Sequence, residues 1–502
     1  MTETAPSTDV RAASAAALSA APVVAASTAA ERASWLAAVA DALDGATDEL
    51  VGIADDETHL GATRLAGEVA RTTGQLRLFA DVVTEGSYLE ATIDHADTTA
   101  TPPRPDLRRV LVPLGPVGVF AASNFPFAFS VAGGDTASAL AAGNPVVVKA
   151  HPAHPRLSRR TAEIARGALA GAGAPEGTFG LVQGHDAGVA LVTDAAIRAV
   201  GFTGSTRGGR ALFDLAVGRA DPIPFYGELG SINPVVVTAD AVRTRGAELA
   251  AGLAASFTLG VGQFCTNPGL VLVPAGTGFP ELVADAASGA AGGLMLTHRM
   301  AEAYASGVET QAAVPGVRRL LGPAAGSSGA HADSAAGSAT DTAAPVVHVT
   351  SAAVVLDHPE LLDEVFGPST LLVTYEGDAD LLAVLQRVGG ALTATLHAAS
   401  DEDVSALVPH LIALAGRVLF AGWPTGVAVT WSQQHGGPWP ATTASLFTSV
   451  GATAIRRFLR PVAFQDAPAA ALPPALREEN PLGIPRRVDG VPTVGEAGRS
   501  AL

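Results

Sequence analysis

The sequence predicts an α/β protein built on buried parallel sheets, with more than one domain. The chain has 502 residues, which suffices for two or three domains that each bury a core. Hydrophobic residues make up 48% of the chain and charged residues 16%, a composition that excludes wholesale disorder. After residue 108, short β-branched runs alternate with alanine-rich stretches, and this alternation is typical of βαβ units.

The first hundred residues predict helices that cover another layer. Residues 1–25 carry no sustained pattern, and we expect them to be frayed. From Glu31 to about Leu50, and again over about 62–83, apolar residues recur at helical spacing. Little strand-like sequence separates these two stretches, so we expect them to form a helical cover.

Two series of strands follow. We expect those of the first series over residues 117–123, 145–150, 179–184 and 198–204, with helices near 131–142, 157–171 and 207–217. We expect those of the second series over residues 233–238, 269–274, 352–357, 369–376 and 392–398. Nucleotides bind at the strand-to-helix turns of such sheets. The sequence therefore predicts two α/β domains in series.

The charge balance argues against two classes of partner. Lys and Arg number 31 against 48 Asp and Glu, and the net charge of −17 disfavours nucleic acid and anionic lipid. The N-terminus lacks a basic segment followed by a sustained apolar run, and its alanine-rich runs never reach the roughly 18 residues of a spanning helix. We therefore expect a cytoplasmic protein that binds neither nucleic acid nor membranes.

Cys265 is the only cysteine, so the chain forms no internal disulfide, which fits a reducing compartment. It lies in GVGQFCTNPG, where a glycine-rich backbone exposes amides that can lower a thiol pKa and bind an oxyanion. The alternative is a small buried hydrophobe. The GVG resembles the start of a dinucleotide fingerprint, but a third glycine and a preceding strand are missing, so we discard that interpretation.

Glu228 and Asn124 are further candidates for chemistry. Glu228 follows an apolar, strand-like stretch in FYGELGSINP, where a carboxylate is costly unless it is used or paired. A capping or strand-end glutamate is the alternative. Asn124 ends a strong strand in AASNFPFAFS, where its amide can donate to a developing oxyanion. A turn-forming asparagine is the alternative there.

Lys149 is the only lysine, against thirty arginines, and this contrast indicates a site that needs a compact ammonium group. A strand-end solubilising charge is the alternative. Gly204 and Ser205, in GFTGSTRGGR, lie at a strand-to-helix turn where phosphate or ribose could meet helix-terminal amides.

Three other polar residues give weaker signals. Glu364, in EVFGPS, is an ordinary loop acid when it is taken alone. His151 and His154 have a spacing that metal sites use, but a proline lies between them and no other ligands cluster nearby. We therefore predict no metal.

The order of these motifs decides among the alternatives. VFAASNFPF, PVVVKA, GFTGS, ELGSINP, GQFCTNPG and EVFGP follow one another over residues 119–368. This succession resembles the aldehyde dehydrogenase superfamily, and the resemblance runs from about residue 31 to about residue 465. Residues 119–155 and QQHGGPWPATTAS (433–445) are similar to one branch, which holds NADP-linked 2,5-dioxovalerate dehydrogenases and a related long-chain fatty aldehyde dehydrogenase.

The resemblance implies a role for each candidate. Cys265 as thiolate would attack the aldehyde, and the Asn124 amide with the Cys265 backbone N–H would bind the thiohemiacetal oxyanion. Glu228 would activate the water that hydrolyses the resulting thioester. Lys149 would contact the adenosine ribose and Glu364 the nicotinamide ribose. The complete set of implied cofactor-binding residues is Lys149, Gly204, Ser205, Gly209, Glu364 and Phe366.

One departure from the family pattern bears on the cofactor. Many NAD-preferring members carry a glutamate three residues after this lysine, whereas the run here is Lys149-Ala150-His151-Pro152. Without that carboxylate a 2′-phosphate escapes like-charge repulsion, so we favour NADP, with NAD as the alternative.

The branch also implies a substrate, 2,5-dioxovalerate (α-ketoglutarate semialdehyde), which would be oxidised to 2-oxoglutarate. A longer or broader range of aliphatic aldehydes is the first alternative, and a non-catalytic dinucleotide-binding protein is the second. For longer aldehydes the candidate apolar entrance consists of Phe127, Phe264, Trp423, Trp431 and Trp439.

The family fold implies a Rossmann-type cofactor domain over residues 1–232 and an α/β catalytic domain over 233–432. Residues 433–502 would form a return segment and a C-terminal tail. Two edge-like strands, 107–114 and about 456–464, are expected to build a small oligomerisation arm of a homodimer or homotetramer. Residues 323–345, rich in Gly, Ser and Ala, predict a mobile surface insertion.

Overall fold

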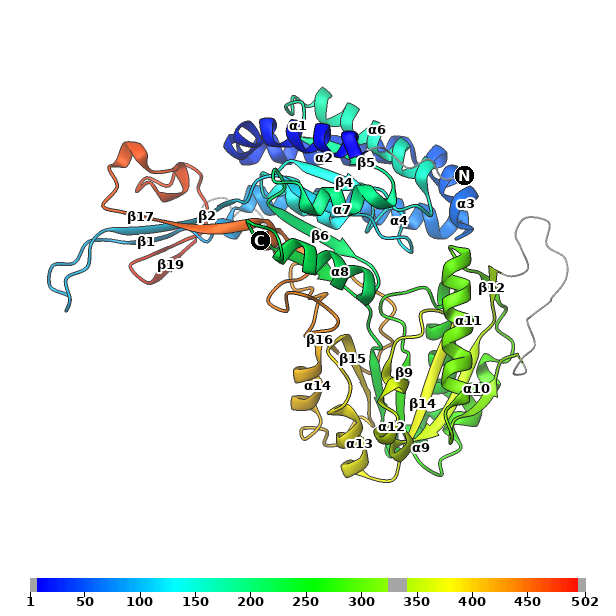
Figure 1. The fold of residues 1–502 in the computed structure, drawn as a ribbon. Helices are drawn as coiled ribbons and strands as arrows, with labels where there is room; N and C mark the ends of the chain where they lie inside the picture. Colours follow the sequence, from blue (N-terminus) through cyan, green and yellow to red (C-terminus); the bar gives the residue numbers. More distant parts are fainter. Residues whose placement is uncertain (1–6, 324–340, 495–502) are drawn as a thin grey trace.

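A computed structural model describes residues 7–323 and 341–494 of the protein. Two sheets of mainly parallel strands carry helices on their faces, and a third sheet extends to one side as an arm (Figure 1). The predicted α/β class with a Rossmann-like sheet is therefore confirmed. Most of the predicted insertion over 323–345 lies outside the described residues. Among the described helices, none combines the length and the apolar character needed to cross a membrane.

The first sheet has the strand order β5-β4-β3-β6-β7, and all its neighbouring strands are parallel. Its strands consist of short, buried apolar runs, which explains why they need helices on both faces. The strands are β3 (Val117–Phe120), β4 (Val146–Lys149), β5 (Phe179–Val182), β6 (Ala199–Thr203) and β7 (Phe225–Glu228). The connecting helices are α5 (Gly134–Ala141), α6 (Pro155–Gly171), α7 (His185–Thr193) and α8 (Thr206–Val217).

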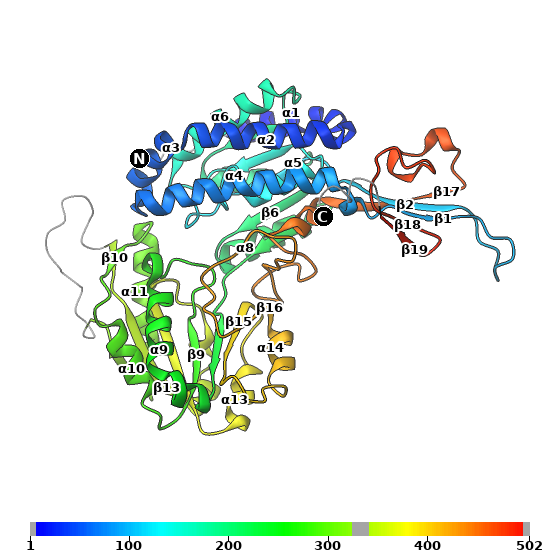
Figure 2. The same ribbon diagram turned by 180° about the vertical axis from the view of Figure 1, so that it is seen from behind.

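Four N-terminal helices cover this sheet, with α2 and α4 side by side (Figure 2). They are α1 (Ser7–Ala26), α2 (Ala29–Gly45), α3 (Thr47–Thr58) and α4 (Ala62–Glu85). The expectation that residues 1–25 are frayed is wrong for the described part, because α1 packs on β5 and α7. Its buried contacts come mostly from small side chains such as Ala17 and Ala20, which give little apolar periodicity to read.

The second sheet has the order β11-β13-β14-β9-β8-β15-β16, and only β11 runs antiparallel to its neighbour. Its strands are β8 (Pro234–Val237), β9 (Leu270–Pro274), β11 (Arg318–Leu321), β13 (Val346–Ser351), β14 (Ser369–Tyr375), β15 (Ala391–His397) and β16 (Ala415–Phe420). The helices on it are α9 (Ala239–Thr258), α10 (Phe279–Ala287), α11 (His298–Ala313), α12 (Ala352–Asp357), α13 (Asp378–Leu385) and α14 (Val408–Leu414). A short pair, β10 (Gly293–Leu294) and β12 (Thr342–Ala343), lies beside them.

One predicted strand is wrong. Residues 352–357 form helix α12, and the strand lies immediately before it, in β13. Both stretches are rich in β-branched residues, so composition does not separate them. The Ser351 side chain accepts a hydrogen bond from the Val354 backbone N–H and so caps the helix at the point where the strand ends.

The arm is a sheet of order β17-β2-β1-β18-β19, built from both ends of the chain. Its strands are β1 (Thr92–Asp94), β2 (Leu107–Pro113), β17 (Leu459–Gln465), β18 (Arg486–Val488) and β19 (Val491–Thr493). The strand predicted over 456–464 starts later than expected, because residues up to Phe458 form a 3₁₀ helix that buries Arg457 against Asp135. The C-terminal tail folds back on the arm, where Leu472, Leu476 and Ile484 pack on Ile93 and Val110.

Candidate active site

The Cys265 loop is shaped by an unusual backbone turn. Helix α9 ends at Thr258, and Gly260, Val261 and Gly262 then adopt left-handed conformations with φ of 56°, 59° and 63°. A Cβ at residue 262 would collide with the backbone of residues 367–368, so only glycine fits there. The β-branched Val261 is strained in this conformation, a feature that clusters at functional sites. The turn presents Cys265 half-buried at its end.

Glu228 ends strand β7 at the carboxyl edge of the first sheet. Residues 441–443 run alongside it: the Leu229 N–H donates to the Ala441 carbonyl (2.8 Å) and the Thr443 N–H to the Gly227 carbonyl (3.1 Å). Only 3% of Glu228 is exposed, so its carboxylate requires partners.

The loop over residues 433–450 supplies those partners. His435 Nε2 lies 3.1 Å from Glu228 Oε1 and 3.5 Å from Cys265 Sγ, and the Ser449 hydroxyl donates to Glu228 Oε2. Reactive atoms of Glu228, Cys265 and His435 all lie within 4.8 Å of one another. A proton on Nε2 gives the carboxylate a donor, so this tautomer fits the site, and the same N–H can face a thiolate. Thiol, imidazole and carboxylate thus form one connected group.

The charges of this group are set by its surroundings. Burial favours the neutral form of Glu228, but His435 and the hydrogen bonds from His435, Ser449 and Cys265 outweigh it and lower the pKa of the carboxyl. Burial of the Cys265 thiol raises its pKa, and the negative charge of Glu228 raises it further, so that it lies well above the usual range. Near neutral pH the free protein therefore carries a protonated thiol beside an ionised carboxylate.

This arrangement predicts the effect of a Glu228→Gln substitution on thiol reactivity. The substitution removes the nearby negative charge, so the pKa of Cys265 falls and more thiolate forms near neutral pH. We expect several-fold faster alkylation by iodoacetamide and a rate-against-pH curve displaced to lower pH. Mass spectrometry follows the reaction without ambiguity because the chain has one cysteine. An unchanged or slower reaction would contradict the assigned coupling.

Asn124 approaches the cysteine loop from the end of β3. Its side-chain amide donates to the Gln263 carbonyl (3.0 Å), and Arg64 Nη2 donates to the Asn124 carbonyl (2.7 Å). An amide group carries two N–H bonds, so one remains for a ligand. The structure thus brings Asn124 and Glu228 to the same loop as Cys265 from two other segments of the chain.

A cavity of about 300 Å³ opens at the Cys265 side chain. It is lined by Arg71, Phe125, Phe129, Phe264, Cys265, Thr266, Thr425, Gly426 and Val427. Of the five aromatic residues expected at an apolar entrance, only Phe264 is among them. Phe127 is in the core, Trp423 packs against His397, and Trp431 and Trp439 are exposed at the surface.

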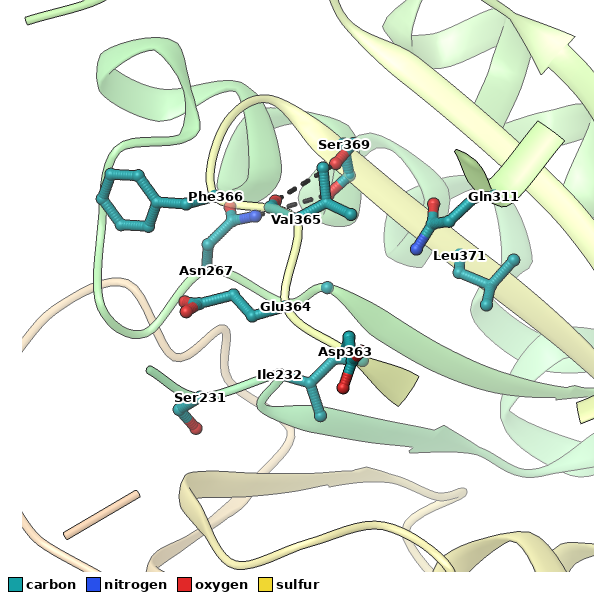
Figure 3. A pocket seen from close by; sticks show the side chains of 11 residues that line it. Ser231, Ile232, Asn267, Gln311, Asp363, Glu364, Val365, Phe366, Ser369 and Leu371 are labelled. Carbon is teal, nitrogen blue, oxygen red and sulfur yellow. Dashed lines mark hydrogen bonds between the residues drawn. The ribbon is translucent and has the colours of Figure 1, made fainter. Parts of the chain in front are cut away.

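Glu364 and Phe366 come from the loop that precedes β14, and both extend to the same side of it (Figure 3). A Cβ on Gly230 would collide with the Glu364 carboxylate, so glycine there lets the carboxylate lie directly against the backbone after β7. Asn267 fixes this loop, since its amide donates to the carbonyls of Gly367 (3.3 Å) and Ser369 (3.4 Å).

The remaining candidates lie along the carboxyl edge of the first sheet. Gly204 and Ser205 form the turn between β6 and α8, where the Ser205 hydroxyl accepts from the Gly208 N–H and caps the helix. A Cβ on Gly209 would collide with Leu229, so glycine allows α8 to pack closely on the strand end. Lys149 ends β4 half-buried, and no partner within residues 7–323 and 341–494 forms an ion pair with it. Burial lowers the pKa of its ammonium group.

These positions fit a dinucleotide. A capped helix N-terminus, an ammonium group that forms no ion pair with the part of the chain described and a carboxylate beside a glycine lie on the first sheet and on the loop next to it. His151 and His154 follow β4, and their rings contact each other (5.7 Å between centroids). His154 Nε2 lies 3.1 Å from the Ala122 carbonyl oxygen.

Sequence reasoning missed three residues of the site: His435, Ser449 and Arg71. The segment that contains His435 is similar to one branch of the family, yet only Trp439 in it was a candidate, and for the apolar entrance rather than for the chemistry. Its histidine, between two glutamines and two glycines, was the available signal. Ser449 and Arg71 gave no signal of their own.

Comparison with known proteins shows which family the chain belongs to. A model of the aldehyde dehydrogenase family matches residues 2–438. The α-ketoglutaric semialdehyde dehydrogenase 2 of Azospirillum brasilense is 49% identical over 469 residues, which cover 92% of this chain and 87% of that protein. The α-ketoglutaric semialdehyde dehydrogenase of Acinetobacter baylyi is 41% identical over 470 residues, with the same coverage of both chains.

Among solved structures, bifunctional proline utilization A superposes with a TM-score of 0.77 at 23% identity, over 94% of this chain. The chain spans less than half of that protein, 46%, and the likeness concerns the fold alone. The protein is thus an oxidoreductase that acts on aldehydes with NAD or NADP, and the chain belongs to the aldehyde dehydrogenase family. The predicted family is confirmed.

Proposed function

We propose that the protein oxidises 2,5-dioxovalerate to 2-oxoglutarate with NADP. The single observation that carries the chemistry is Cys265 in a cavity wall beside the Glu228–His435 pair. The substrate is supported by the two relatives named for α-ketoglutaric semialdehyde, at 49% and 41% identity over 92% of the chain.

In the first half of the reaction, Cys265 attacks the aldehyde carbon. The thiol proton leaves to solvent as the thiolate forms, and the His435 Nε2–H faces the thiolate that remains. The Asn124 amide, with the backbone N–H of Cys265, binds the oxyanion of the thiohemiacetal. NADP, when bound, supplies the hydride acceptor.

In the second half, water hydrolyses the thioester on Cys265. Glu228 is the base for this water, because it is ionised at neutral pH and lies beside the sulfur. His435 and Ser449 hold its two carboxylate oxygens, which fixes the direction of the free lone pairs. Glu228 alone therefore serves as base in this step, and its two partners are positioning residues.

The preference for NADP rests on the surroundings of Lys149. No carboxylate follows it at residue 152, and within the described residues its ammonium group forms no ion pair. A 2′-phosphate on the adenosine ribose would meet a positive charge there without a competing negative one. Glu364 and Phe366 would hold the nicotinamide end, and Gly204, Ser205 and Gly209 the turn beside the diphosphate.

A Lys149→Met substitution tests this preference. Methionine keeps the length of the side chain and removes the charge, so the pairing with the 2′-phosphate is lost. We expect kcat/KM for NADP to fall about 10- to 100-fold, as for the loss of a charged hydrogen bond, and kcat/KM for NAD to fall less. Initial rates with both cofactors at saturating aldehyde measure the difference. Equal losses for the two cofactors would contradict the role in phosphate recognition.

The function itself is tested by the initial rate of NADPH formation across a panel of aldehydes. We expect the highest kcat/KM for 2,5-dioxovalerate with NADP, ahead of pentanal and of longer aliphatic aldehydes. A rate that rises steadily with chain length would instead favour a long-chain aldehyde dehydrogenase. Dinucleotide binding without oxidation of any aldehyde would favour a non-catalytic protein.

The arm supports the remaining part of the proposal, a homodimer or homotetramer. Its outermost strand β19 leaves Val491 62% exposed and the adjoining Val494 73% exposed, so a strand edge with apolar side chains is open for pairing. Light scattering on the eluting protein measures the assembly. The division of the chain at residues 232 and 432 and the cytoplasmic location stay predictions.

A further inference from the structure

One arginine, Arg71, lines the cavity at Cys265, and two others, Arg64 and Arg417, contact residues of its wall or close to it. Arg64 Nη2 donates to the Asn124 carbonyl at 2.7 Å. Arg417 donates to the carbonyls of Gly426 (2.6 Å) and Pro424 (2.7 Å) and so shapes the loop at the cavity wall. Each of these two guanidinium groups is thus anchored to the backbone by at least one hydrogen bond, although Arg64 Nη1 and Arg417 Nε are buried without a partner among the described residues.

Arg71 differs from both. It lines the cavity that contains Cys265, and its guanidinium lies over the rings of Phe125 (5.5 Å) and Phe129 (5.2 Å). Within residues 7–323 and 341–494 it makes neither a hydrogen bond nor an ion pair, and its Nε and Nη2 atoms are buried without a partner. The group has five N–H donors arranged to match a carboxylate, and none of them is used.

The carboxylates near Arg71 do not pair with it directly. Arg64, Glu68 and Arg71 lie on one face of α4. The negative charges of Glu68 and Glu228 favour the charged form of Arg71, but neither forms an ion pair with it within the described residues. Glu68 Oε1 accepts from the backbone N–H groups of Phe127 (2.9 Å) and Ala128 (3.1 Å) rather than from Arg71. A half-buried guanidinium that forms no ion pair or hydrogen bond with the described residues is costly, which indicates that a ligand supplies the missing partner.

We infer that Arg71 binds the carboxylate of the substrate, at the end of the molecule remote from the aldehyde. This inference rests on the proposed function, since the aldehyde end must reach Cys265 in the same cavity. The aromatic rings on Phe125, Phe129 and Phe264 enclose the short carbon chain between the two ends. The substrate class is therefore a short aldehyde with a terminal carboxylate, and Arg71 determines the specificity for that anion.

The sole cysteine permits a test that does not depend on turnover. Iodoacetate carries a carboxylate and iodoacetamide does not, and both alkylate Cys265. The ratio of their alkylation rates measures how strongly the cavity favours an anion at a fixed distance from the sulfur. A change in the pKa of the thiol affects both rates equally and so does not alter the ratio. We expect Arg71→Met to lower this ratio at least about 10-fold. Arg71→Lys should keep part of it.

Kinetics with matched aldehydes form the second measurement. For wild type we expect succinic semialdehyde to have a far higher kcat/KM than butanal. Arg71→Met should lower kcat/KM for succinic semialdehyde about 100-fold, mainly through KM, and leave butanal within about 3-fold. Arg77→Met is the control, because Arg77 lies on the same helix but is exposed and paired with Asp41 and Asp44. It should change neither substrate.

The possible results distinguish a failure of the carboxylate subsite from a failure of the proposed function. If wild type oxidises both aldehydes with equal efficiency, the carboxylate subsite is refuted and the dehydrogenase activity stands. If Arg71→Met loses both substrates equally with an unchanged alkylation ratio, Arg71 acts only on the fold or the thiol, and the subsite is again refuted. If wild type reduces NADP with neither aldehyde nor with 2,5-dioxovalerate, the proposed function itself is wrong.

Discussion

A Cys265→Ala variant is expected to lose NADPH formation by at least about 10⁴-fold, the largest effect of any single substitution in the site. In the proposed mechanism the thiol supplies the only covalent bond between enzyme and substrate, and no other residue that lines the cavity carries a thiol. Purified wild type and variant, assayed with 2,5-dioxovalerate and NADP, provide the measurement.

Loss of activity must be separated from loss of structure in that experiment. The Cys265 side chain contacts His435 at 3.5 Å but donates to no backbone group that shapes the loop, so the fold should persist. The variant should therefore bind NADP with unchanged affinity and unfold at a similar temperature. A folded variant with activity within 10-fold of wild type would refute covalent catalysis by this residue.

Glu228→Gln is expected to lower steady-state turnover by about 10²- to 10⁴-fold while leaving a rapid first turnover. The thiol can still attack, because removal of the Glu228 charge favours the thiolate. Hydrolysis of the thioester loses its base, so the acyl enzyme accumulates. A burst of NADPH close to one equivalent, followed by a slow phase, is the kinetic result, and intact mass spectrometry should detect the acylated protein.

A Glu163→Gln variant is the matched control, because Glu163 is an exposed carboxylate on α6 that pairs with Arg160 nearby. It should show no burst beyond that of wild type and no change in turnover. If Glu228→Gln instead abolishes the burst together with turnover, Glu228 is needed to form the thioester, and its assignment to hydrolysis alone is wrong.

The residues that could be predicted from the sequence share one property. Cys265, Glu228 and Asn124 each lie in a short motif whose local chemistry already limits the backbone: glycines around the thiol, a strand before the carboxylate, a proline after the amide. The first sheet was predicted for the same reason, since its strands are short apolar runs followed directly by helices. Short stretches of sequence predict these features because the features depend on the conformation of neighbouring residues.

The residues that could not be predicted depend on contacts between distant segments. His435 and Ser449 acquire meaning only because the loop over 433–450 returns to the end of β7. Arg71 lies on a helix, where a charged side chain normally faces water. Its position over the rings of Phe125 and Phe129, which are distant in sequence, shows that it faces the interior instead. Helix α1 was missed for another reason, because alanine packing leaves no apolar period.

The return of residues 433–450 to β7 has a consequence for the order in which the protein matures. Domains form from the N-terminus as the chain leaves the ribosome, so β7 and the Cys265 loop exist before their partners have been synthesised. Until His435 and Ser449 have been synthesised, Glu228 lacks both of these donors and Cys265 lacks its imidazole neighbour. A nascent or truncated polypeptide that ends before residue 435 therefore contains the Cys265 thiol without these two partners. The complete site forms only after residue 449 has been synthesised.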